Sequence, residues 1–130
     1  MWMPLIDITK EMGIMSFASG THKLGYVTSK EISDESESFF RNFVVENKFP
    51  VSGATSAKAG DATFHSGWTL HNAPANTSPT MREVMTIIYF ADKTKVLQPD
   101  HENREADHRT WLMSIPPGQY AESELNPLLG

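Results

Sequence analysis

The segment from Arg82 to Ala91 constrains the fold of this chain more than any other stretch. In an extended conformation both faces of the segment are apolar: one carries Val84, Thr86, Ile88 and Phe90, and the other carries Met85, Ile87 and Tyr89. Side chains of a β-strand point alternately to its two faces, and a strand that is apolar on both is typical of a sheet buried between two layers. The segment therefore predicts a buried β-strand in a layered, mainly β fold.

Shorter apolar runs predict further strands. Residues 2–7 and 14–18 read as two strands with a short connection, and residues 62–65 and 67–71 read as short strand-like pieces. Residues 49–61 are rich in Gly, Ser and Ala, so we expect a loop there. Several short strands separated by turn residues are typical of an all-β sandwich or jelly roll.

A helix is expected over residues 33–48. Asp34 followed by Glu37 is similar to a capping box, and an apolar stripe recurs at helical spacing, made of Phe39, Phe40, Phe43 and Val44. The charged segment 100–108 is expected to be a loop or a short helix. The pattern over residues 1–130 thus predicts a single, mainly β domain with a helix on its outside.

Composition restricts both the partners and the kind of metal site. The 130 residues carry a net charge of −5 and no run of Lys or Arg, which argues against nucleic acid or an anionic membrane as the main partner. We see neither a signal peptide nor an apolar stretch long enough to span a membrane, so a cytoplasmic protein is expected. Because the chain has no Cys, a metal would be held by His, Asp or Glu, which favours iron, manganese or zinc.

His71 and Arg82 are the candidate functional residues. His71 closes an expected strand, and Arg82 opens the next one after a turn-rich loop at residues 72–80. If the two strands pair antiparallel, both side chains can face one cavity. A neutral imidazole binds metals, and a guanidinium grips a carboxylate with two parallel hydrogen bonds. Such a cavity would hold a chelating keto acid by both ends.

The stretch from Gly60 to Asn76, continued to Arg82, resembles the signature of the phytanoyl-CoA dioxygenase family. Weaker similarity covers residues 2–23, where Ser19 stands in place of the family's usual Pro, and the Asn126-Pro127 region. The resemblance implies a cupin-like jelly roll, a double-stranded β-helix with one or two outer helices, of which residues 1–130 would be the C-terminal portion.

The same resemblance implies a cofactor and roles for three residues. The family's enzymes use iron(II) as the metal and 2-oxoglutarate as the co-substrate. By position in the motif, His71 would be a metal ligand and Arg82 would anchor 2-oxoglutarate. Trp2 falls on a family position that lines the 2-oxoglutarate pocket.

Two departures from the family's pattern bear on this expectation. Ala73 stands where some members have a Ser that contacts the cofactor. The family's other iron ligands form a His-x-Asp pair, and none of the five His residues here is followed at the second position by Asp or Glu. We therefore expect a chain that starts after this pair and has little or no activity alone. An upstream His-x-Gly or His-x-Ala would instead imply a halogenase.

Plainer structural interpretations stay open for several residues. Trp2 fits an ordinary core position as well as a pocket wall, and His65 favours a structural role over a pocket role. His101 and His108 lie two helical turns apart, but a solvated charged segment is favoured over a metal site there. The acidic stretch 31–37 is most simply a helix start.

Two functions from different classes are compatible with this sequence. The first is an iron- and 2-oxoglutarate-dependent dioxygenase, a hydroxylase that acts on a small-molecule substrate. The alternative is a non-catalytic jelly-roll module that binds a small carboxylate through Arg82, or a protein partner through exposed strand edges. Exposed edges invite pairing with another chain, so a homodimer is also expected.

Overall fold

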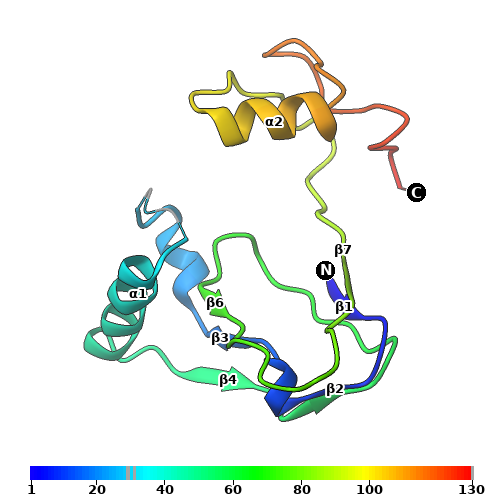
Figure 1. Cartoon of the computed structure of the whole chain (residues 1–130). Helices are drawn as coiled ribbons and strands as arrows, with labels where there is room; N and C mark the ends of the chain where they lie inside the picture. Colours follow the sequence, from blue (N-terminus) through cyan, green and yellow to red (C-terminus); the bar gives the residue numbers. More distant parts are fainter. Residues whose placement is uncertain (29, 31, 130) are drawn as a thin grey trace. The chain divides into compact units, whose positions relative to one another are not determined.

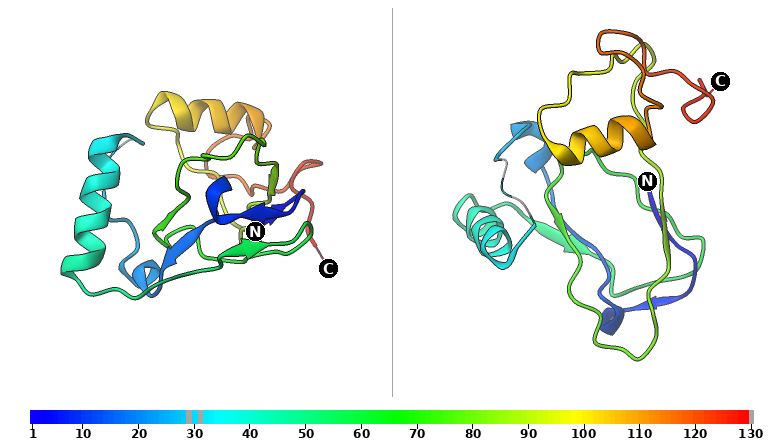
Figure 2. Two further views of the ribbon diagram at one scale, coloured as in Figure 1. Left: turned by 60° about the horizontal axis from the view of Figure 1, so that its bottom comes forward. Right: turned by 45° about the horizontal axis from the view of Figure 1, so that its top comes forward.

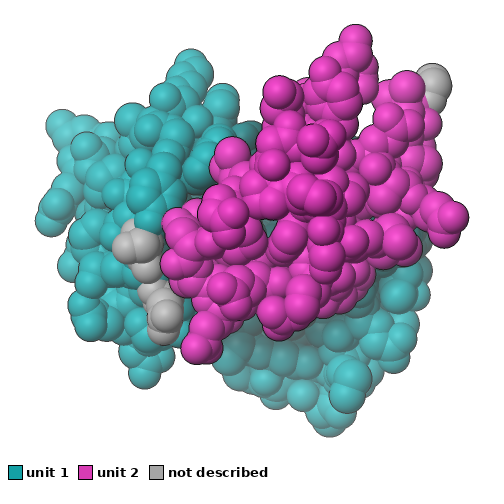
Figure 3. Space-filling view, turned by 90° about the horizontal axis from the view of Figure 1, so that it is seen from above, with its two compact units in different colours: residues 1–87 teal, residues 88–130 magenta. Residues whose placement is uncertain are grey.

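A computed structural model describes residues 1–28, 30 and 32–129 (Figure 1). Glu31, at the start of the predicted acidic stretch, lies outside the described residues. The chain divides into two compact units, unit 1 at Met1–Ile87 and unit 2 at Ile88–Gly130 (Figure 3). Two compact units can belong to one domain, so the single domain over residues 1–130 stays a prediction.

Unit 1 is built from short antiparallel strands that form small separate sheets (Figure 1). One sheet pairs β1 (Trp2–Pro4) with β7 (Val84–Thr86), and a second pairs β2 (Ile8–Thr9) with β5 (Ser56–Ala57). In the third sheet β3 (Ser16–Ala18) lies between β4 (Val51–Gly53) and β6 (His71–Asn72). Segments far apart in sequence therefore meet in every sheet.

The core of unit 1 lies along the first strands. Trp2, Ile8 and Met12 form a buried cluster, against which further apolar side chains pack: Ile6, Ile14 and Met15. Met12 belongs to a short 3-10 helix, η1 (Lys10–Met12), which lies between β2 and β3 in the sequence. Burying apolar surface is the main favourable contribution to folding, so this cluster anchors the N-terminal strands.

A buried threonine connects β3 to the segment before β6. Thr21, at the start of the 3-10 helix η2 (Thr21–Leu24), is fully buried. Its Oγ1 donates to the Ala18 carbonyl at 2.8 Å and accepts from the Leu70 N–H at 2.9 Å. Because both polar functions of the hydroxyl are satisfied, the side chain can be buried at little cost. The contact fixes Leu70 directly before His71.

Helix α1 (Asp34–Glu46) confirms the helix predicted from the apolar stripe. Its cap differs from the predicted one: Ser33 is the N-cap and Ser36, not Glu37, closes the capping box. The hydroxyls of Ser33 and Ser36 exchange hydrogen bonds with each other's backbone N–H at 3.2 and 2.9 Å. In both views of Figure 2 the helix, in cyan, stands at the periphery of unit 1.

Unit 2 contains helix α2 (Glu102–Thr110), so of the two alternatives predicted for the charged segment, a loop or a short helix, the structure has the helix. Two short segments on either side of α2 in the sequence meet at an isolated antiparallel bridge between Lys95 and Tyr120, beside which Val96 and Ala121 are buried. The Val96 N–H donates to the Gln119 carbonyl at 2.9 Å, and the Gly118 N–H donates to the Val96 carbonyl at 2.8 Å. Gly118 has a φ of 87°, which a residue without a side chain adopts readily, and it lies in a turn in which the Gln119 N–H donates to the Pro116 carbonyl at 3.1 Å.

The prediction of a long buried strand at residues 82–91 is wrong. Only Val84–Thr86 form a strand, and the apolar side chains of the segment are exposed, with Val84 at 36% and Ile88 at 83%. The reason lies in the partner. β1 has only three residues, and pairing ends where the Ile87 N–H donates to the Met1 carbonyl at 3.0 Å. An alternating apolar pattern favours an extended segment, but the segment becomes a strand only where a neighbouring strand pairs with it.

The loop predicted at residues 49–61 is also partly wrong, since β4 and β5 lie within it. Apart from Val51, their residues have no strong strand propensity, and pairing with β3 and β2 places them in sheets. In the described part of the chain the architecture is small antiparallel sheets with two helices, without a closed barrel. No helix in that part is both long and apolar enough to cross a membrane.

Candidate functional site

One ring nitrogen of His71 is held by a hydrogen bond to the backbone. His71 begins β6, opposite Phe17 of β3. Its Nδ1 lies 2.8 Å from the Thr69 carbonyl oxygen. A carbonyl only accepts, so Nδ1 carries the proton and donates it. In the neutral ring this leaves the lone pair on Nε2, and such a backbone contact is the usual outer-shell support for a metal-binding His.

His65 lies beside His71, which the sequence-based interpretation did not foresee. The ring centroids of the two imidazoles are 4.9 Å apart, and Phe17 lies 4.9 Å from His65 and 6.3 Å from His71. The Nδ1 atom of His65 is buried and has no hydrogen-bond partner among the described residues. Burial, and next the neighbouring His71, lowers the pKa of His65 below its usual value. His65 therefore favours the neutral form.

A signal for this neighbour was present in the sequence. His65 and His71 are six residues apart, an even spacing that places two side chains on the same face of an extended segment. The intervening chain does not run as one strand, since the Thr69 N–H donates to the Ser66 carbonyl at 2.9 Å in a turn. The proximity of the two rings is therefore decided by the turn and by Phe17.

Arg82 lies two residues before β7 and is half-buried. Its Nη1 donates to the Gly13 carbonyl, and it lies 3.4 Å from the Met12 carbonyl. None of the ion pairs among the described side chains includes Arg82. Both carbonyl contacts are made by one nitrogen, so other N–H groups of the guanidinium remain for a carboxylate.

Gly13 makes the close approach of Arg82 possible. It has a φ of 79°, and a Cβ built on it would lie 2.0 Å from the Pro74 carbonyl oxygen and 3.0 Å from the Arg82 Nη1. Pro74 belongs to the loop that follows His71. Because residue 13 has no side chain, the η1 turn, the loop after His71 and the Arg82 guanidinium can approach one another closely.

Trp2 is an ordinary core residue in this structure. It is 7% exposed and packs with Ile8 and Met12. Its backbone pairs with Thr86 of β7 and bridges to Thr63. This is the plain core role that the sequence left open for Trp2, and the role as a wall of a 2-oxoglutarate pocket stays a prediction.

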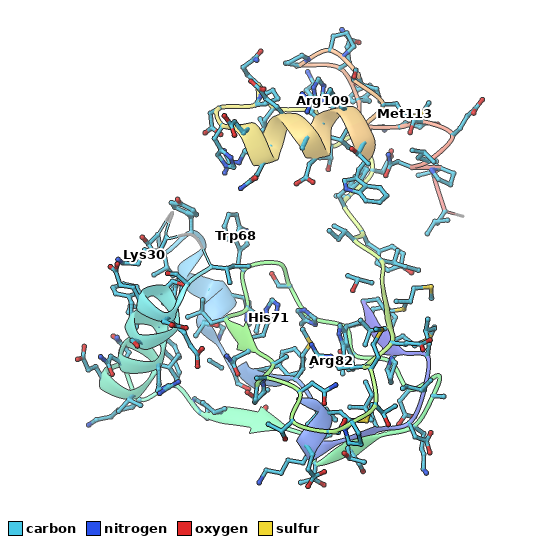
Figure 4. All side chains as sticks on the ribbon, in the orientation of Figure 1. Lys30, Trp68, His71, Arg82, Arg109 and Met113 are labelled. Carbon is cyan, nitrogen blue, oxygen red and sulfur yellow. The ribbon has the colours of Figure 1, made fainter. Side chains whose placement is uncertain are left out.

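β6, which begins at His71, does not pair with β7, which begins two residues after Arg82, contrary to the condition on which a shared cavity was predicted. β6 pairs with β3, whereas β7 pairs with β1. Figure 4 nevertheless shows both side chains in unit 1, on the inner side of the ring of chain that contains β3, β6 and β7. Their common location comes from the long connections between the sheets and not from a shared ladder.

Across the described residues no three His, Asp or Glu side chains gather in a way that could hold a metal ion. His101 is exposed and His108 is half-buried, and the two belong to no such group. His101 is the N-cap of α2, and His108 Nε2 lies 2.6 Å from the Ile115 carbonyl. The shallow hollow of unit 2, lined by residues between Gln119 and Leu128, contains none of the predicted site residues.

Comparison with known proteins gives one positive finding. The family profile of phytanoyl-CoA dioxygenase (PhyH) matches residues 1–84. The matched range contains His65, His71 and Arg82, together with every sheet of unit 1 except the last two residues of β7. No curated protein and no solved structure matches the chain significantly.

Proposed function

We propose, because this chain belongs to the phytanoyl-CoA dioxygenase family, that it serves iron- and 2-oxoglutarate-dependent oxygenase chemistry. His71 would bind the metal and Arg82 would anchor 2-oxoglutarate. The observation that carries the proposal is that the family match covers both residues, each with a free group suited to its role. When bound, iron(II) and 2-oxoglutarate supply the oxidising power for hydroxylation of a small-molecule substrate.

His71 contributes a neutral nitrogen donor of fixed direction. Its Nδ1–H is held by the Thr69 carbonyl, so rotation of the ring and exchange of tautomer both cost a hydrogen bond. Leu70, directly before it, is held in turn by the buried Thr21 hydroxyl. These two contacts direct the Nε2 lone pair before any ligand arrives, which lowers the cost of ordering the site on binding.

Arg82 contributes a half-buried cation without an acidic partner among the described residues. The carbonyls of Gly13 and Met12 hold one of its nitrogens, which orients the plane of the guanidinium. A dicarboxylate would supply the missing negative charge and accept hydrogen bonds from the remaining donors. Charge-assisted pairs of this kind are stronger than neutral hydrogen bonds, so the distal carboxylate of 2-oxoglutarate is the natural ligand.

We extend the proposal to the fold and to the activity of the isolated chain. The small antiparallel sheets are compatible with a portion of a cupin-like jelly roll. One imidazole gives weak affinity and poorly defined geometry for iron, and the sequence offers no His-x-Asp or His-x-Glu. We therefore expect little or no turnover by this chain alone, and pairing of copies through exposed strand edges stays part of the proposal.

Binding of 2-oxoglutarate by calorimetry tests the role of Arg82. Arg82→Met should weaken binding about 10- to 100-fold, since a hydrogen bond to a charged group contributes about 1.5–3 kcal/mol, and Arg82→Lys should lie between. Arg104→Met, which alters an exposed ion pair with Asp100, is the matched control. Unchanged affinity of a folded Arg82→Met variant would refute the assignment.

The alternative, a non-catalytic module that binds small carboxylates, predicts a different result in the same assay. Succinate lacks the keto oxygen with which 2-oxoglutarate chelates a metal. A carboxylate-binding module should bind the two dicarboxylates equally, with or without Co²⁺ as a redox-stable substitute for iron. A metal-dependent preference for 2-oxoglutarate supports the oxygenase. Measurable 2-oxoglutarate decarboxylation by the purified chain would contradict the expected lack of activity.

A further inference from the structure

We propose that His65 and His71 together bind one divalent transition-metal ion through their imidazole nitrogens. The proposed function assigns a single ligand, His71, and this inference adds a second ligand from the same chain. It rests on the proposed function only for the identity of the ion as iron. The pair of rings and its chemistry are features of the structure alone.

The separation of the rings suits a shared ion. A ring nitrogen lies about 2.1 Å from a bound metal, and the ring centre lies roughly 1.1 Å beyond it, so each centroid is about 3.2 Å from the ion. Two imidazoles at tetrahedral to octahedral angles then have centroids about 4.5–5.2 Å apart. The observed separation of 4.9 Å falls within this range, so the ion needs no large movement of the backbone.

Each ring also has a nitrogen that remains for the ion. In His71 the bond from Nδ1 to the Thr69 carbonyl leaves Nε2. In His65 the buried Nδ1 has no hydrogen-bond partner among the described residues. A buried polar atom without a partner is costly, and coordination removes that cost. The χ2 torsion of His is broad, so the ring of His65 can turn its nitrogen toward the ion while it stays on Phe17.

Ring packing alone also explains a separation of 4.9 Å, because aromatic pairs have centroids about 4.5–7 Å apart. Packing does not, however, explain a nitrogen without a hydrogen-bond partner on a ring that contacts another imidazole. Imidazole nitrogens are typical ligands of iron, cobalt, nickel, copper and zinc. The site has room in its coordination sphere for further ligands, since the structure brings no third His, Asp or Glu to it among the described residues.

Titration of the full chain with Co²⁺ by calorimetry tests the proposal. His65→Phe keeps a ring against Phe17 but removes the nitrogen, and His71→Phe does the same in β6. Each should weaken Co²⁺ binding by at least about 10-fold, the scale seen when even an outer-shell partner of a metal ligand is lost. His22→Phe, a change at an exposed His in η2, should leave the affinity unchanged.

Proton NMR of the Co²⁺-loaded wild-type chain provides a readout that needs no variant. Each coordinated imidazole with a protonated second nitrogen gives one strongly shifted exchangeable resonance, so two are expected. One resonance, together with wild-type affinity in His65→Phe and weak binding in His71→Phe, would overturn the proposal and leave the proposed function intact. Wild-type affinity in both variants would refute the metal role of His71 as well.

Discussion

Replacement of Gly13 by Ala tests how strongly the approach of Arg82 depends on a missing side chain. The φ of 79° at Gly13 costs a residue with a Cβ about 1–2 kcal/mol. The new Cβ would also lie 2.0 Å from the Pro74 carbonyl oxygen, which is backbone and cannot simply rotate away. Relief of overpacking of this kind costs typically about 1–3 kcal/mol, so Gly13→Ala should destabilise the protein by about 2–5 kcal/mol.

Gly20→Ala is the matched control, because it separates backbone strain from the clash. Gly20 has a φ of 91°, and a Cβ there would meet nothing within 4 Å. The control should therefore lose only the conformational part, about 1–2 kcal/mol, partly offset by the lower entropy of the unfolded chain. The difference between the two variants, about 1–3 kcal/mol, measures the contact with Pro74.

Urea unfolding at equilibrium and thermal unfolding give the two free energies. For a chain of 130 residues, 1 kcal/mol corresponds to roughly 4 °C in Tm, so Gly13→Ala should unfold about 4–12 °C below Gly20→Ala. The NMR signal of the Arg82 guanidinium should shift in Gly13→Ala and stay in place in Gly20→Ala. Equal unfolding midpoints for the two variants would refute the reasoning that a side chain at residue 13 clashes with Pro74.

Two further predictions concern a buried hydroxyl and an exposed ion pair. Thr21→Val should cost about 1–3 kcal/mol in urea unfolding, because it leaves the half-buried Leu70 N–H without its acceptor; stability equal to that of Thr21→Ser would contradict this. The Lys58 ammonium, and next the Ala59 N–H, lower the pKa of the Asp7 carboxyl. The pair therefore contributes stability above the usual pKa of Asp, and the contribution is lost as the pH falls through the lowered folded-state value. Lys58→Gln should raise the Asp7 pKa in an NMR titration, whereas Lys58→Arg should not, and the same Asp7 pKa in both variants would refute the pairing.

Elements with local hydrogen bonds were predictable from the sequence. Helix α1 was expected from an apolar stripe, and α2 was one of two readings of a charged segment. A helix satisfies its backbone within four residues, so its pattern carries most of the needed information. The capping residues were misassigned because Ser33 and Ser36 take the roles expected of Asp34 and Glu37, and short polar side chains compete closely for a helix start.

Strands were predicted less well, because their partners are distant in sequence. β1 and β7 join residues as far apart as Trp2 and Thr86, and no periodicity within either segment specifies that partner. The apolar pattern that continues after Thr86 therefore predicted a strand that is too long, whereas β4, which contains Ser and Gly, was not predicted. Pairing, and not intrinsic propensity, decides such short strands.

For the candidate site, the sequence by itself indicated the family through the motif that contains His71 and Arg82, and the match to residues 1–84 confirms that family, while the roles of the two residues stay predictions. Only the tertiary structure decided how their atoms are placed. It placed the ring of His65 beside His71, directed the Nδ1–H of His71 to the Thr69 carbonyl, and held Arg82 on the carbonyls of Met12 and Gly13. The physical reason is that residue types fix the available chemistry, whereas the folded backbone, through a local bond at His71 and long-range bonds at Arg82, fixes which of their atoms remain free to use it.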